Sequence, residues 1–96
     1  MPEIYKYKGI IFKFYSNEHY PIHIHAICDG QIMKIILIME NEKITKVIYE
    51  PVTDTFEKEK ELKAFVNAFK YNLVDAWVKY FVYHKHIKPI TITRKL

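Results

Sequence analysis

Hydrophobic and polar residues alternate with a period of two along the first half of the chain, a pattern typical of β-strands. The alternating segments are rich in aromatic and β-branched residues, which favour extended backbone. They predict strands at residues 4–7, 10–15, 22–28, 31–39 and 44–49. Two-residue turns are expected at Lys8-Gly9 and Asp29-Gly30, and Asp-Gly is a strong hairpin signal. Residues 16–21 are expected to form a loop.

A two-residue turn at Asp29-Gly30 fixes the register of the hairpin around it, and so predicts which side chains share a face. One face is fully apolar, and the other carries histidines. The predicted apolar pairs are Ala26 with Met33, Ile24 with Ile35, and Ile22 with Leu37. The predicted pairs on the other face are His25 with Lys34 and His23 with Ile36.

The period changes to three and four in the second half, which predicts one long amphipathic helix over residues 57–82. Asp54 and Thr55 are the candidate caps of this helix, and Glu57 is placed to close a capping box on Asp54. Pro89 ends the helical pattern, and residues 90–93 alternate as a last strand, expected at a sheet edge. The predicted apolar stripe of the helix comprises Leu62, Phe65, Val66, Phe69, Leu73, Ala76, Trp77, Tyr80 and Phe81.

These elements predict an α+β fold, in which a mostly antiparallel sheet of about five to six strands packs against the long helix. We expect a single domain over residues 1–96, because a chain of 96 residues has no room for a second core. The apolar face of residues 22–28 is the natural partner of the helix, and the histidine face is then the outer one.

Composition narrows the class of protein. The single cysteine, Cys28, forms no intramolecular disulfide and no multi-cysteine zinc site, which suits a reducing compartment. The first residues lack the apolar core of a signal peptide, and no apolar run is long enough to span a membrane. We therefore expect a cytoplasmic protein. The formal net charge is +4, and no acidic residue follows Asp75, so the basic C-terminal end is either a solvated tail or a surface for phosphates.

The candidate chemistry lies in residues 17–25, which hold three of the five histidines. His23 and His25 are one residue apart on a strand, so both rings leave the same face about 6–7 Å apart. His19 and Glu18 precede them on the loop. His84 and His86 repeat the spacing after the helix and would matter only if the fold brought them to His23 and His25.

Three hypotheses fit this cluster. The first is a single divalent metal held by His19, His23 and His25, although Lys34 beside His25 weakens it. The second is metal-free acid–base cleavage of RNA, with His23 and His25 as acid and base, Lys34 as phosphate anchor, and His19 and Glu18 as orienting groups. The third is a surface for a protein partner or a second copy, bordered by Ile27, Ile32 and Ile36, without chemistry.

Several motifs resemble the bacterial domain of unknown function 4160 family. They are the opening Met-Pro-Glu-Ile, the segment Phe-Lys-Phe-Tyr-Ser-Asn-Glu-His at residues 12–19, Pro21-x-His23-x-His25, and Ala-Trp-Val-Lys-Tyr-Phe at residues 76–81. The chain departs from the family at Asn41-Glu42, where relatives can turn with Asn-Gly.

The resemblance implies a small protein without an established activity, whose gene often lies beside that of another small domain. It implies a toxin–antitoxin-like component with a small protein partner and RNA as a target. It also implies that Glu18, His19, His23 and His25 belong to one site.

Overall fold

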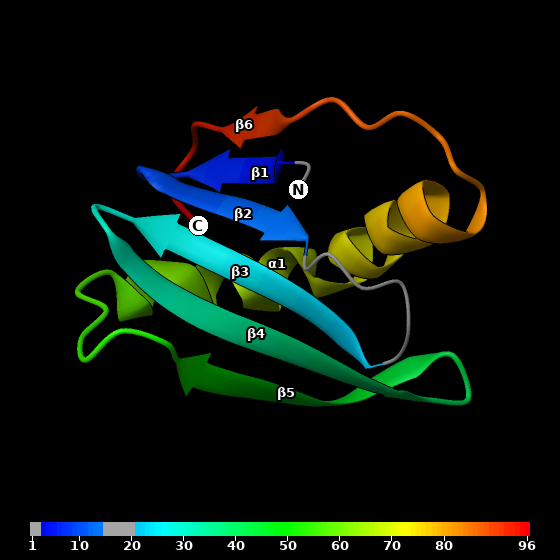
Figure 1. Cartoon of the computed structure of the whole chain (residues 1–96), viewed down its shortest axis with the longest axis horizontal. Helices are drawn as coiled ribbons and strands as arrows, with labels where there is room; N and C mark the ends of the chain where they lie inside the picture. Colours follow the sequence, from blue (N-terminus) through cyan, green and yellow to red (C-terminus); the bar gives the residue numbers. More distant parts are fainter. Residues whose placement is uncertain (1–2, 15–20) are drawn as a thin grey trace.

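The computed structural model describes residues 3–14 and 21–96, and it confirms the α+β class (Figure 1). These residues form one sheet with strand order β5-β4-β3-β2-β1-β6, antiparallel throughout except for the parallel β1–β6 pair. One helical segment lies across a face of the sheet. The elements are β1 (Glu3–Tyr7), β2 (Ile10–Phe14), β3 (Ile22–Cys28), β4 (Gln31–Glu40), β5 (Lys43–Pro51), α1 (Glu59–Trp77), the π-helical turn η1 (Val78–Val82) and β6 (Ile90–Ile92).

Three tight turns connect the antiparallel strands, and both residues of each turn have positive φ, as a type I′ turn requires. The predicted turns at Lys8-Gly9 and Asp29-Gly30 are confirmed, with φ of 80° at Gly9 and 78° at Gly30. The third turn is Asn41-Glu42, where Glu42 has a φ of 66° at a position that usually takes glycine. This hairpin also carries a register shift between Ile38 and Met39.

The register predicted for the β3–β4 hairpin is confirmed. Ile24 pairs with Ile35 on one face, and His25 pairs with Lys34 on the other. The turn between these strands has only two residues, so it allows no other register. A shift by one residue would move every side chain of the strand to the wrong face.

The core lies between the sheet and α1. Phe65 of the helix is fully buried, and its ring lies 4.3 Å from that of Phe12 and 4.8 Å from that of Phe69, measured between centroids. Trp77 is 3% exposed, which confirms it as a core residue. Burying each such side chain contributes roughly 1.5–3 kcal/mol, so the helix is held mainly by this stripe. The other fully or almost fully buried residues of the stripe are Leu62, Val66 and Leu73.

The predicted capping box at Asp54 and Glu57 is wrong. The helix begins at Glu59, and Lys58 before it makes no side-chain cap hydrogen bond. The side chain of Gln31, at the start of β4, instead forms two hydrogen bonds with the segment that precedes the helix. Its amide oxygen accepts a hydrogen bond from the backbone N–H of Glu57 at 2.8 Å, and its amide nitrogen donates to the Thr55 hydroxyl at 3.2 Å. This tertiary contact fixes the segment that leads into the helix, and it does not cap the helix itself, because Thr55 and Glu57 precede Lys58.

The helical segment ends at Val82, as predicted, although its last turn is π-helical. The chain then crosses to the far edge of the sheet, where β6 pairs with β1 (Figure 1). The predicted edge strand is therefore confirmed, over residues 90–92 of the expected 90–93. No helix among the described residues is long and apolar enough to cross a bilayer.

Candidate histidine site on the open face of the sheet

One face of the sheet carries α1, and the opposite one, here called the open face, carries the histidines. Strand β3 alternates between the two along its whole length, because successive side chains of a strand point to opposite sides. Ile22 and Ile24 are fully buried toward the helix, whereas His23 and His25 are half-buried on the open face. This confirms that the histidine face is the outer one.

His25 lies in the middle of a row of charged residues. Lys13 of β2 is its direct partner on one side, and Lys34 of β4 is its partner on the other. Lys34 in turn pairs with Glu50 of β5, and their charged groups lie 3.7 Å apart. Lys13, His25 and Lys34 are called the basic row below. An anion above His25 would have an ammonium group on each side.

Burial and nearby positive charges both affect the protonation of His25. Burial lowers the pKa of His25 below its usual value of 6.5, and the positive charges of Lys34 and His23 lower it further. These effects favour the neutral form of the imidazole. A neutral imidazole can accept a proton, which is the property that a general base needs.

Apolar residues border the basic row on both sides. Ile11, Ile27 and Ile32 are paired across β2, β3 and β4 on one side of it. On the other side, His23 pairs with Ile36, which pairs with Ile48. The five isoleucines, Ile11, Ile27, Ile32, Ile36 and Ile48, are called the isoleucine rows. Ile36 is only 8% exposed, although it lies on the open face.

The structure brings together three of the five predicted site residues, His23, His25 and Lys34. The other two, Glu18 and His19, lie outside the described residues. The sequence missed Lys13, because a two-residue turn fixes the β3–β4 register, whereas no such turn signal joins β2 to β3. The segment Phe-Lys-Phe at residues 12–14 alternates, which put Lys13 on the polar side of its strand but left its neighbour on β3 open.

Residues 3–14 and 21–96 contain no group of three His, Cys, Asp or Glu side chains placed to hold one metal ion. His84 and His86 are both exposed on the segment that follows η1, so they do not join His23 and His25 in such a group. The third ligand of the metal hypothesis, His19, is not among the described residues. The two lysines that flank His25 make this part of the open face unfavourable for a cation.

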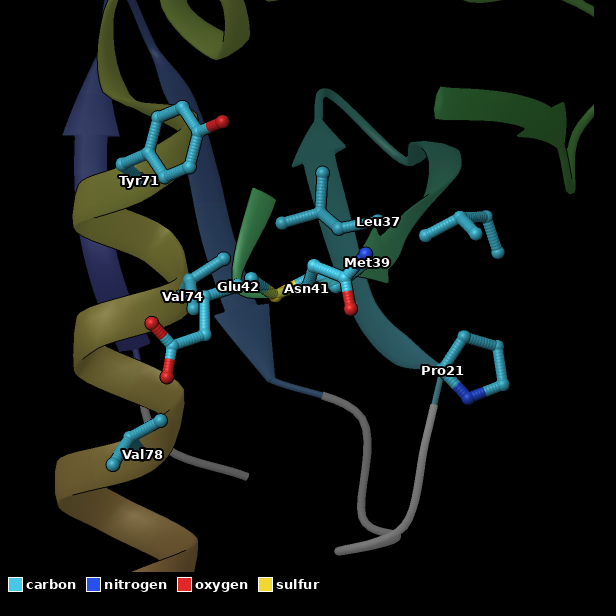
Figure 2. Close-up of a pocket in the computed structure, with 9 residues that line it drawn as sticks. Pro21, Leu37, Met39, Asn41, Glu42, Tyr71, Val74 and Val78 are labelled. Carbon is cyan, nitrogen blue, oxygen red and sulfur yellow. The ribbon is translucent and has the colours of Figure 1, made fainter. Parts of the chain in front are cut away.

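A separate pocket of about 730 Å³ lies between α1 and the end of the β4–β5 hairpin. Figure 2 shows Tyr71, Val74 and Val78 on the helix side of it and Leu37 and Met39 on the sheet side. Its volume suits a small ligand, and its walls are mainly apolar. None of the predicted site residues lines it. The pocket is also lined by Pro21, Ile38, Asn41 and Glu42.

The hairpin at this pocket is tied to the helix. The backbone N–H of Ile44 donates a hydrogen bond to the Tyr71 hydroxyl at 3.1 Å. Glu42, which has left-handed backbone, lines the pocket beside it. The pocket and the basic row are therefore two distinct features.

A comparison with known protein families identifies a match. The model of the family described as a domain of unknown function (DUF4160) matches residues 9–78, which include β2 to β5, all of α1 and the basic row. No curated protein and no solved structure is similar to this chain. The chain thus belongs to the DUF4160 family, which confirms the resemblance to that family.

Proposed function

We propose that this protein binds RNA on the open face of its sheet and cleaves it without a metal, as one component of a toxin–antitoxin-like pair. The observation that carries this proposal is the basic row, in which two lysines flank a histidine of lowered pKa. The lysines favour a phosphate above His25, and the neutral imidazole is ready to take up a proton.

The reaction would use the 2′-hydroxyl of the RNA as its nucleophile. His25 accepts the 2′-hydroxyl proton as general base, while a bond forms between the 2′-oxygen and phosphorus. The bond from phosphorus to the 5′-oxygen breaks, and His23 protonates that oxygen as general acid. Lys34 and Lys13 stabilise the extra negative charge of the phosphorane. The products are a 2′,3′-cyclic phosphate and a 5′-hydroxyl.

The spacing of the two histidines suits these roles. Residues i and i+2 of a strand are about 6–7 Å apart, which leaves room for one phosphate between the rings. Glu18 and His19 are proposed as the orienting groups, since they precede β3 by only a few residues in the sequence.

The test is cleavage of a labelled RNA in the presence of a chelator. We expect the wild-type chain to release products with a 2′,3′-cyclic phosphate, and the His23→Ala/His25→Ala double variant to lose this activity. His84→Ala/His86→Ala is the matched control, because it removes two histidines at the same spacing from an exposed segment. Substrate with a 2′-deoxy sugar at the cleavage point should resist. Cleavage that survives the first double variant would refute the catalytic roles.

Binding is tested separately from cleavage. Lys13→Ala/Lys34→Ala should weaken RNA binding and reduce the slope of log affinity against log salt by roughly 1.4, since single-stranded RNA contributes about 0.7 per contact. Lys60→Ala/Lys70→Ala on α1 has the same net charge and should bind as the wild type does. Equal losses in both variants would mean that only net charge matters.

A second candidate function is a non-enzymatic interaction module, and the isoleucine rows favour it. Residues of this kind on an open sheet face are typical of a surface that a partner covers. The candidate partner is the product of the neighbouring gene that the family resemblance implies. If it binds here, Ile27→Lys/Ile32→Lys should abolish co-purification from cells that express both proteins, while His23→Ala/His25→Ala should retain it.

A further inference from the structure

We propose that two copies of this chain associate through β5, side by side and antiparallel, so that their sheets become one continuous sheet. This inference rests on the edge of the sheet and does not depend on the proposed activity toward RNA.

The edge strand β5 has the length and exposure that such pairing needs. It spans nine residues and stands at one end of the strand order, and within the described part of the chain no element pairs with its outer side (Figure 1). An edge strand presents unpaired N–H and C=O groups that favour addition of another strand.

The hydrogen-bond phase of β5 shows which groups point outward. The N–H of Val52 donates to the Ile32 carbonyl at 2.9 Å, next to the Met33–Pro51 pair. Backbone N–H and C=O groups along an antiparallel strand alternate between its two neighbours. Those of residues 46, 48 and 50 therefore point toward β4. Val47 and Tyr49 then point their backbone N–H and C=O groups away from the sheet.

One register of β5 against itself satisfies both charge and packing. If the two-fold axis passes through Ile48, Lys46 of each copy lies opposite Glu50 of the other, and Val47 lies opposite Tyr49. Lys46 and Glu50 are exposed on the open face, where their partners within the sheet are Ile38 and Lys34. Lys34, Glu50 and Lys46 of the second copy then alternate in sign. The outward groups of Val47 and Tyr49 meet as hydrogen-bonded pairs.

Neighbouring registers are worse. An axis through Lys46 would place the two Lys46 ammonium groups opposite each other. An axis through Val47 or Tyr49 would place a charged side chain opposite Ile48. A lysine on an edge strand usually prevents pairing, but here Glu50 of the second copy offsets it. The sequence of β5 therefore favours one self-complementary register.

The pairing would double the histidine surface. A two-fold axis perpendicular to the sheet keeps both open faces on the same side. Measured across the strands, the two His25 residues would then be five strand spacings apart, about 24 Å, and they would also be offset by about four residues along the strand direction. The helices would lie together on the opposite side, clear of this surface.

Charge reversal tests the contact. Sedimentation over a concentration series should show a reversible dimer for the wild type. Lys46→Glu and Glu50→Lys should each give a folded monomer, because each creates like charges across the axis, and the combined swap should restore the dimer. Lys60→Glu on α1 is the matched control and should dimerise as the wild type does. A wild type that stays monomeric at every concentration would overturn the proposal.

Cross-linking tests the register independently. At an axis through Ile48 the two Ile48 Cα atoms form a non-hydrogen-bonded pair about 4.5 Å apart, within the range for a disulfide. Ile48→Cys should therefore form a covalent dimer under mild oxidation. Val47→Cys and the wild type, in which Cys28 is buried, should not. Faster cross-linking at Val47→Cys would refute this register.

Discussion

His25 and Lys34 lie directly opposite each other on the open face, in neighbouring strands joined by a two-residue turn. This relationship couples the protonation of His25 to a fixed positive charge. It was predictable from the sequence, because the Asp29-Gly30 turn leaves only one register. Its electrostatic consequence is open to direct measurement.

We predict that the pKa of His25, followed by the NMR shift of its ring proton, lies below 6.5, because burial, Lys34 and His23 all disfavour the charged form. Lys34→Met should raise the pKa without restoring the usual value, since burial is the larger cause. Lys60→Met on α1 should leave it unchanged. A His25 pKa above 6.5 in the wild type would contradict this account.

The same shift predicts how stability depends on pH. The unfolded chain binds a proton at this histidine more readily than the folded chain does. The contribution of neutral His25 is therefore fully present above about pH 6.5 and is lost as pH falls toward the lowered pKa. Denaturant titrations above and below pH 6.5 should show this loss, and His25→Gln should show less of it. A contribution that grew on acidification would have the wrong sign.

We next predict that protein purified without a histidine tag carries much less than one equivalent of zinc, iron or nickel. Lys13 and Lys34 flank His25, and their charges oppose a divalent cation at that position. Elemental analysis measures the content, and Lys13→Ala/Lys34→Ala should increase zinc uptake. Near-stoichiometric metal that disappears in His23→Ala/His25→Ala would favour the metal hypothesis over RNA cleavage.

The sequence predicted most of the fold, since its signals were local. Tight turns and strict alternation defined β3 and β4, and the three-and-four spacing defined the buried stripe of α1. The errors came from contacts between distant residues. Gln31 holds the start of the helical segment across 26 positions of sequence, so the local capping signal at Asp54 was misleading. Lys13 reaches His25 through a register that no short turn fixes.

The third hairpin offers a prediction about backbone strain. Glu42 has a φ of 66°, where a residue with a Cβ is disfavoured, and the other two turns have glycine at this position. Glu42→Gly should therefore stabilise the fold by about 1 kcal/mol in denaturant titrations. Lys43→Gly, one residue later in β5, is the matched control and should destabilise it. Equal effects of the two changes would show that Glu42 is not strained.

The last prediction concerns the start of the helical segment. The Gln31 side chain makes two hydrogen bonds there, to Glu57 and Thr55, whereas Asp54 makes no cap bond. Gln31→Ala should cost about 1–2 kcal/mol of unfolding free energy, and Asp54→Ala should change it by less than about 0.5 kcal/mol. Gln31→Glu separates the two bonds, because it keeps the oxygen that accepts from Glu57 and loses the N–H that donates to Thr55. We expect an intermediate loss. If Asp54→Ala proved the more harmful change, the local cap would hold the helix after all, and the contact from β4 would be incidental.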